Sequence, residues 1–112
     1  MISNIDPDWA WSEFETTAAA PWNIRSAAHL FRRAGFGATK SQLLAAVNVG
    51  PTAAVEAMLS DSQEPAGYLA EISSLANAGL ATGNPKQLSA WWTYRMLTTD
   101  AQLLEKLTLF WH

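Results

Sequence analysis

Apolar residues recur at intervals of three and four along most of this chain, and this helical period constrains its fold more than any other feature. No segment alternates polar and apolar residues for long enough to predict a β-strand. Glycine, proline and helix-capping residues divide the pattern into six segments. Their approximate ranges are 22–33, 39–49, 51–59, 68–78, 85–97 and 99–112. We therefore expect an all-α fold, an irregular bundle of about six short helices.

Three local signals mark where these helices begin and end. Thr39 with Gln42, and Thr99 with Gln102, have the spacing of a capping box, in which both side chains satisfy backbone N–H groups at a helix start. Gly35 follows the last turn of the first helix and is predicted to end it as a left-handed cap. Each boundary therefore has a local chemical cause in the sequence.

Residues 1–21 are expected to form an irregular N-terminal arm, whose Trp9, Trp11 and Phe14 could dock onto a neighbouring surface. The first twenty residues contain four acids and no Lys or Arg, whereas a secretory signal peptide begins with basic residues. The chain also lacks an uninterrupted apolar run of eighteen residues, so it predicts no membrane span. The localisation is not specified by the sequence, and the default expectation is a soluble protein.

The composition suggests that some apolar surface meets other polypeptide. Hydrophobic residues make up 49% of the chain and charged residues only 15%, against about 25% charged in typical domains. The apolar stripe of the last helix includes Leu107, Phe110 and Trp111 and continues to His112 without a stop signal. We therefore expect residues 22–112 to be the N-terminal helical part of a larger, truncated domain, with the remainder of the chain beyond residue 112 as its first partner.

Charge and cysteine content exclude several function classes. The net charge is −3, and the basic residues cluster only at Arg25 and at Arg32 with Arg33, so we expect no nucleic-acid partner. The chain has no cysteine, which excludes disulfides, thiolate catalysis and cysteine-ligated zinc within it. The sequence identifies no cofactor, and a protein partner remains open.

Three segments together carry a family resemblance. They read AAHLFRRAGFGAT at 27–39, WWTYRML at 91–97 and EKLTLFWH at 105–112. In this order and spacing they resemble the opening motifs of the bacterial family with domain of unknown function DUF1800, with Phe31 where that family more often has leucine. The resemblance implies a protein several times longer than this chain, with no established activity. The sequence is therefore expected to be a DUF1800-like N-terminal fragment.

One candidate binding site lies at the end of the first helix. His29, Arg32 and Arg33 are three and four residues apart and lie on neighbouring parts of the helix surface. Arginine binds carboxylate or phosphate through two parallel hydrogen bonds, so these residues are anion-binding candidates. The alternative is that the arginines stabilise the helix end and pair with acids elsewhere, because a helix C-terminus disfavours anions.

A second set of candidates lies in the last two helices. His112 is a weak metal-ligand candidate, and the alternative is a histidine packed in an aromatic cluster. Trp91 and Trp92 near Arg95 could stack a sugar or a base, or could simply pack against other helices. Four aromatic residues of this region are interface candidates, namely Trp91, Trp92, Phe110 and Trp111. The adjacent charges of Glu105 and Lys106 are expected to be solvated.

Two functions of different classes remain open. In the first, this region is a helical scaffold or interaction region without a complete catalytic site. In the second, it is the N-terminal part of a hydrolase-type enzyme whose His-based or metal-assisted site is completed beyond residue 112. Whether the protein is an enzyme, and its catalytic residues, are not determined by the sequence.

Overall fold

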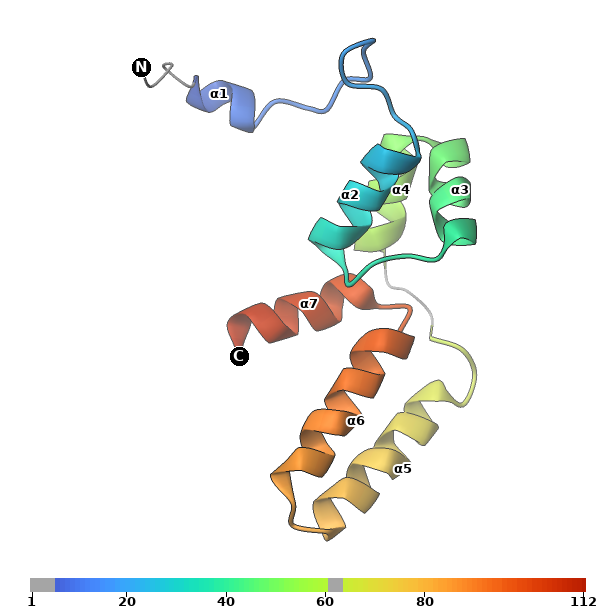
Figure 1. Cartoon of the computed structure of the whole chain (residues 1–112), viewed down its shortest axis with the longest axis vertical. Coiled ribbons are helices and arrows are strands. Elements are labelled where there is room, and N and C mark those ends of the chain that lie inside the picture. Colours follow the sequence, from blue (N-terminus) through green and yellow to red (C-terminus); the bar gives the residue numbers. More distant parts are fainter. Residues whose placement is uncertain (1–5, 61–63) are drawn as a thin grey trace.

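The computed structural model describes residues 6–60 and 64–112, and these residues form helices joined by turns and loops (Figure 1). The helices are α1 (Pro7–Ala10), α2 (Ile24–Ala34), α3 (Lys40–Val49), α4 (Pro51–Leu59), α5 (Tyr68–Ala81), α6 (Pro85–Thr98) and α7 (Gln102–Trp111). The described ranges contain no β-strand, which confirms the predicted all-α class. The single turn of α1 lies within the predicted N-terminal arm and was not foreseen.

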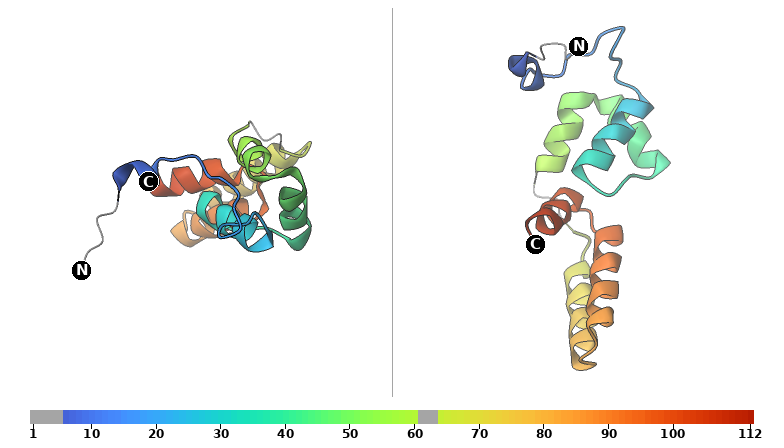
Figure 2. Two further views of the ribbon diagram at one scale, coloured as in Figure 1. Left: turned by 90° about the horizontal axis from the view of Figure 1, so that it is seen from above. Right: turned by 60° about the vertical axis from the view of Figure 1, so that its left-hand side comes forward.

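The helices form two groups with α7 between them (Figure 1; Figure 2, right). Helices α2, α3 and α4 pack together, and α5 pairs with α6 as a hairpin. Helix α7 contacts α2, α4 and α6 and so joins the two groups. The molecule measures 55 × 36 × 21 Å and its radius of gyration is 18.0 Å. A compact domain of this length would have a radius of gyration of about 13 Å, so the chain is elongated.

The α2–α4 group has a core of small residues. Ala27, Ala46 and Ala54 are buried, and partly buried larger side chains surround them, including Trp22 and Phe31. The Trp22 indole Nε1 donates a hydrogen bond of 3.1 Å to the carbonyl oxygen of Ala46, 24 residues away. Because alanine side chains contribute little apolar area, most hydrophobic stabilisation of this group comes from the larger residues at its rim.

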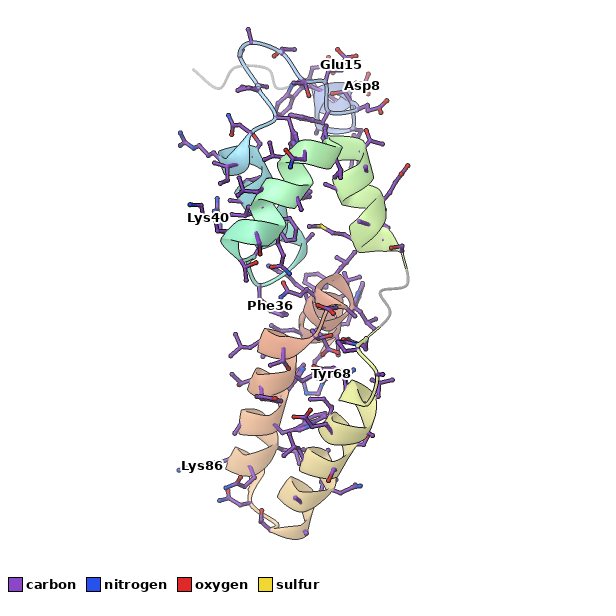
Figure 3. All side chains as sticks on the ribbon, turned by 90° about the vertical axis from the view of Figure 1, so that its right-hand side faces the viewer. Asp8, Glu15, Phe36, Lys40, Tyr68 and Lys86 are labelled. Carbon is purple, nitrogen blue, oxygen red and sulfur yellow. The ribbon has the colours of Figure 1, made fainter. Side chains whose placement is uncertain are left out.

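The α5–α6 hairpin is held by side chains that reach from one helix to the other. Ile72 of α5 is buried, and its carbonyl oxygen accepts a 2.8 Å hydrogen bond from Nε1 of Trp91 on α6. The Tyr68 hydroxyl lies 3.0 Å from Oγ1 of Thr98, and the Tyr94 hydroxyl donates to Oε1 of Glu71 at 3.2 Å. Each hydrogen bond crosses between the two helices, so together they set the pairing of the hairpin. Figure 3 shows α5 and α6 side by side with their side chains.

The contact between Tyr94 and Glu71 makes the hairpin less stable at alkaline pH. The hydrogen bond to Glu71 raises the pKa of Tyr94 above its ordinary value of 10.0. The pKa is raised further by repulsion between the phenolate and the Glu71 carboxylate, by burial and by the charge of Tyr68. The pKa of Tyr94 is higher in the folded than in the unfolded chain, so the stabilisation is complete below pH 10.0 and is lost as the pH rises through the folded-state value.

A titration of phenolate absorbance tests this contact. In a Tyr68→Phe background, which leaves Tyr94 as the sole tyrosine of these 112 residues, the phenolate of Tyr94 should form at lower pH after Glu71→Gln. Glu56→Gln should leave the midpoint unchanged, and an equal midpoint in all variants would contradict the assignment.

The two predicted capping boxes have different outcomes. The first is present: Thr39 N donates to Oε1 of Gln42 at 2.8 Å, and Gln42 N donates to Oγ1 of Thr39 at 3.3 Å. The second prediction is wrong, because Ala101 is the N-cap of α7 and makes no side-chain cap bond. Thr99 Oγ1 donates instead to the Glu64 carboxylate, and Gln102 Oε1 accepts from the backbone N–H of Phe36. Partners from distant segments have replaced the local ones.

The predicted left-handed cap at Gly35 is also wrong. Gly35 has φ −150° and ψ −155°, an extended conformation open to any residue. Its need for glycine is steric, because a Cβ atom there would lie 2.6 Å from Oε1 of Gln102 and 3.1 Å from Cβ of Gln102. Gly37, with φ 131°, is the residue of this turn that adopts the left-handed region. Glycine at 35 therefore allows α7 to approach the end of α2.

Among the described residues, no single helix is long and apolar enough to cross a membrane. Helices α3 and α4 meet the length and composition criteria only as a pair, and they are bent by 118° at their junction.

Candidate functional site at the α7 junction

The polar side of α7 faces the rest of the protein. Gln102, Glu105 and Lys106 lie on one side of the helix, because residues three and four apart share a face. The Gln102 and Lys106 side chains bond to the end of α2, and the Glu105 side chain bonds to α6. This arrangement is the reverse of the usual surface helix, whose apolar side faces inward.

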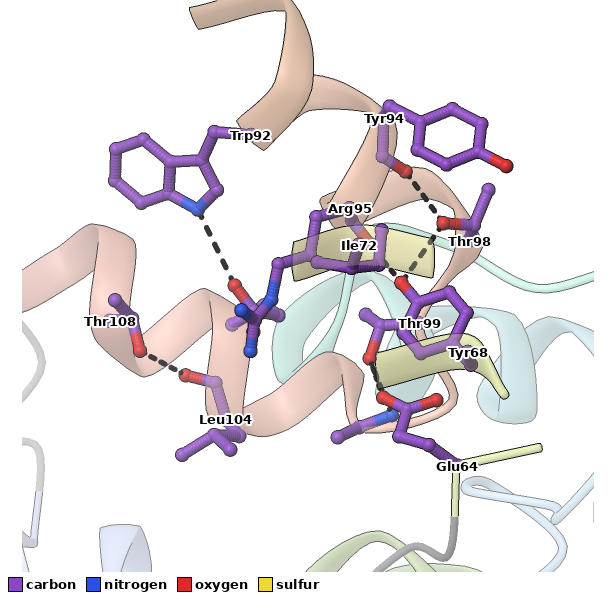
Figure 4. Close-up of polar contacts among 12 residues, drawn as sticks. Glu64, Tyr68, Ile72, Trp92, Tyr94, Arg95, Thr98, Thr99, Leu104 and Thr108 are labelled. Carbon is purple, nitrogen blue, oxygen red and sulfur yellow. Dashed lines mark hydrogen bonds and ion pairs between the residues drawn. The ribbon is translucent and has the colours of Figure 1, made fainter. Parts of the chain in front are cut away.

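Glu105 is the most buried charged residue in the described part of the chain, with 3% of its surface exposed. Its Oε1 forms an ion pair with Nε of Arg95 at 2.6 Å, and its Oε2 accepts a hydrogen bond from Nε1 of Trp92 at 3.4 Å (Figure 4). The Arg95 guanidinium carbon lies 5.9 Å from the ring centroid of Trp91. Both tryptophans of α6 therefore belong to one network with the ion pair, and this network fixes α7 against α6.

Lys106 fixes the other end of the junction. Its Nζ donates hydrogen bonds to the carbonyl oxygens of Arg32 at 2.6 Å and Gly35 at 2.7 Å. These carbonyls lie at the C-terminal end of α2, where the helix dipole favours a cation. The main-chain carbonyls at the end of α2 are therefore paired with a lysine, and this contact does not test anion binding by His29, Arg32 and Arg33.

Glu64 ties the segment before α5 to the turn between α6 and α7. Its carboxylate accepts one hydrogen bond from the Thr99 hydroxyl and another, of 3.1 Å, from the backbone N–H of Asp100 (Figure 4). Thr99 is buried and its Oγ1 also accepts from the N–H of Ala101. The turn that introduces α7 is thus held by a residue 35 positions earlier in the chain.

A substitution at Gly35 should disturb the approach of α7 to α2. A methyl group would displace the Gln102 amide and remove the 3.0 Å hydrogen bond from Phe36 N, so Gly35→Ala should lower the free energy of unfolding by about 1–3 kcal/mol. The loss should be measured by urea denaturation. In a Gln102→Ala background the same substitution should cost less, because the nearest atom is gone. Equal costs in the two backgrounds would show that the two residues do not interact.

The predicted anion-binding residues lie on the exposed surface of α2. The side chains of His29, Arg32 and Arg33 are exposed and form no hydrogen bond or ion pair with the residues that the structure describes. Arg25, one turn before His29, is exposed in the same way. The structure brings these four residues onto one helix but not into a pocket, and anion binding stays a prediction.

The predicted metal-ligand candidate His112 packs against an aromatic residue. Its ring stands edge-on to Trp92, with 5.4 Å between the ring centroids. Both residues line an apolar pocket of about 570 Å³ near the loop between α5 and α6, together with Leu80, Leu88 and Trp91. Within residues 6–60 and 64–112 there is no group of three or more His, Asp or Glu side chains placed to hold a metal ion. The role of His112 in metal binding stays a prediction.

The four interface candidates divide into two pairs. Trp91 and Trp92 are partly buried, and their indole N–H groups are hydrogen-bonded within the chain. Phe110 and Trp111 are 75% and 80% exposed and stack edge-on to each other at 5.2 Å between centroids. The stacking of a sugar or base on Trp91 and Trp92 stays a prediction, and Arg95 already lies over the Trp91 ring.

A second apolar pocket of about 370 Å³ lies between α7 and the α2–α4 group. Small side chains of these helices form most of its wall, and polar groups of the α6–α7 turn stand at one side. The lining residues are Phe31, Ala34, Gly35, Gly37, Gln42, Ala45, Ala46, Val49, Ala54, Ala57, Met58, Thr99, Asp100, Gln102 and Leu103.

The central residues of the junction, Glu105 and Lys106, were missed by sequence reasoning. The expectation that Glu105 is solvated is wrong, because it is almost fully buried. The available signal was the position of Glu105 opposite the leucine and aromatic stripe of α7. That signal shows only that the two sides of α7 differ, and it does not reveal which side faces the protein.

The fold and the junction define an all-helical region in which a polar helix face joins two helical groups. The chain matches the family described as "Protein of unknown function (DUF1800)" over residues 29–112, which is more than half of its length. It belongs to this family, as the three motifs of the sequence implied. No curated protein and no solved structure matches the chain.

Proposed function

We propose that residues 22–112 serve as the N-terminal helical scaffold of a larger DUF1800 domain. In this proposal the outer face of α7, formed by Leu104, Leu107, Phe110 and Trp111, is covered by further polypeptide of the same protein. The observation that carries the proposal is the reversed orientation of α7, whose polar side is bonded inward while its apolar side is exposed.

The outer face is continuous and cannot be buried by a simple rotation of α7. Its four residues fall within about 120° of the helix circumference at 100° per residue, and all four are exposed. Rotating the helix would break the Glu105–Arg95 ion pair and the two hydrogen bonds of Lys106. A contiguous apolar patch of this kind marks an interaction site on soluble proteins.

The shape of the molecule supports the same proposal. Its radius of gyration of 18.0 Å exceeds the value of about 13 Å for a compact domain of this length. The buried apolar side chains in the described ranges are three alanines and Ile72. Such a small core gives little hydrophobic stabilisation, and burial of the outer face against further polypeptide would add to it.

Binding of a hydrophobic dye tests whether the outer face is accessible. The 112-residue chain should bind the dye and self-associate, and Leu107→Gln with Phe110→Gln should reduce dye fluorescence several-fold. The matched control is Leu59→Gln with Leu97→Gln, two leucines that are also well exposed and line neither apolar pocket. The control should keep most of the signal. A monomeric, cooperatively melting chain that binds no dye would refute the proposal, as would equal loss in both variants.

Cysteine labelling tests which molecule covers the face. The chain has no cysteine, so Leu107→Cys introduces the sole thiol of these 112 residues. The thiol should react quickly in the 112-residue chain and slowly in the longer protein that the proposal implies. Labelling of both after denaturation provides the reference rate. Equal rates in the two folded proteins would show that the polypeptide beyond this chain leaves the face open.

Metal analysis separates this proposal from the hydrolase-type alternative. That alternative requires His112 to contribute to a site that is completed by other residues. Stoichiometric bound metal in the longer protein that is lost in His112→Ala, but kept in His29→Ala, would support the enzyme and count against a purely structural role for this region.

A further inference from the structure

The N-terminal arm carries negative charge and aromatic side chains that the rest of the described chain leaves unengaged. The Glu13 and Glu15 carboxylates form no hydrogen bond or ion pair with residues 6–60 or 64–112. Trp9 and Trp11 are 74% and 89% exposed. Figures 1 and 2 show α1 lying apart from the α2–α4 group. The arm therefore presents the Glu13 and Glu15 carboxylates and the Trp9 and Trp11 indoles to the outside.

Helix α2 presents the complementary charge. Arg25, His29 and Arg32 follow each other at intervals of four and three, so they form a line on one side of the helix, with Arg33 beside it. All four side chains are exposed, while the opposite side of α2 packs on α3 through Ala27 and its neighbours. Like charges in this spacing repel one another along a helix. Carboxylates bound to this basic stripe, formed by Arg25, His29, Arg32 and Arg33, would relieve that repulsion.

The arm of the same chain is anchored so that it leads away from its own α2. Phe14 packs edge-on against Trp22 with 6.3 Å between centroids, and the Ser26 hydroxyl donates to the carbonyl oxygen of Pro21 at 2.6 Å. These contacts hold the base of the arm at the N-terminal end of α2. The basic stripe runs from there toward the C-terminal end of the helix, so an arm held at its base does not lie along it.

We propose that the acidic arm of one copy of this chain binds the basic stripe of α2 on a second copy, reciprocally, in a two-fold symmetric dimer. Arginine forks pair with the carboxylates of the arm, and arginine side chains stack on its exposed indoles. The reciprocal exchange gives each dimer two equal arm–stripe contacts, as a two-fold axis requires. This contact is separate from the outer face of α7.

Salt dependence in solution gives the first test. The 112-residue chain carrying Leu107→Gln and Phe110→Gln, which suppress association through α7, should be dimeric at low ionic strength and monomeric at high ionic strength by sedimentation velocity. Charge reversal at Glu13→Lys with Glu15→Lys, or at Arg25→Glu with Arg32→Glu, should make each variant monomeric at low salt. The control Lys40→Glu with Lys86→Glu should leave the dimer intact, and circular dichroism should show equal helix content in all variants.

Mixing the two reversed variants gives the decisive test. Alone, each variant places like charges where positions 13 and 15 meet positions 25 and 32, whereas a one-to-one mixture pairs opposite charges at these positions in both contacts. The mixture should therefore form a heterodimer. A monomeric chain at low salt, a dimer insensitive to both reversals, or a mixture that stays monomeric would overturn the proposal.

Discussion

Replacing Arg95 by methionine should destabilise the chain more than any other single substitution at the α7 junction. The methionine keeps the aliphatic length but leaves the Glu105 carboxylate buried beside Trp92 without its cation. Removing one partner of a buried ion pair typically costs about 3–5 kcal/mol, and we expect the lower end because Arg95 is partly exposed. Urea denaturation followed by circular dichroism measures the change.

The opposite substitution provides the control. Glu105→Gln leaves Arg95 able to reach water, so the expected loss is only about 1–2 kcal/mol. In the double variant Arg95→Met with Glu105→Leu no charge remains, and most of the stability should return. If the double variant costs as much as the sum of Arg95→Met and Glu105→Leu made singly, Glu105 and Arg95 do not act as a pair.

Replacing Trp22 by alanine should have the second large effect, because the α2–α4 core consists mainly of alanines. Trp22 supplies one of the few large side chains against this core and donates a hydrogen bond to Ala46 O. Loss of a packed tryptophan costs about 3–5 kcal/mol, and partial exposure of Trp22 places the expected value near 3 kcal/mol. The free energy of unfolding in urea is again the measurement.

Two further variants separate packing from hydrogen bonding at this position. Trp22→Phe keeps most of the apolar contact and should cost about 1 kcal/mol for the lost hydrogen bond. Trp11→Ala removes the same side chain from a site that is 89% exposed and should change stability by less than about 0.5 kcal/mol. A Trp22→Ala variant as stable as Trp11→Ala would contradict the assigned role.

Several features of the fold could be predicted because their causes are local. The helical period of apolar residues predicts the all-α class, and Pro51 and Pro85 occupy the first positions of α4 and α6 as predicted. The Thr39–Gln42 capping box forms from two residues that are three positions apart. The family assignment likewise depends on continuous motifs. In each case the interacting residues are neighbours in the chain, so the sequence contains the whole interaction.

The candidate site could not be predicted because its interactions join distant residues. Thr99 and Gln102 have the capping-box pattern, yet Thr99 bonds to Glu64 and Gln102 bonds to Phe36, 66 residues away. Gly35 fits a cap pattern, but its requirement for glycine comes from the approach of α7.

What the sequence by itself determined is therefore the helices, most of their ends, the family and the two-sided character of α7. Only the tertiary structure decided which side of α7 faces the protein. The spacing of apolar residues shows that the two sides of a helix differ, but it does not show which side faces the protein. The direction was set by groups that are far away in the sequence, namely Arg95 for Glu105 and the main-chain carbonyls at the end of α2 for Lys106. These partners turn the polar side inward and leave Phe110 and Trp111 on the surface.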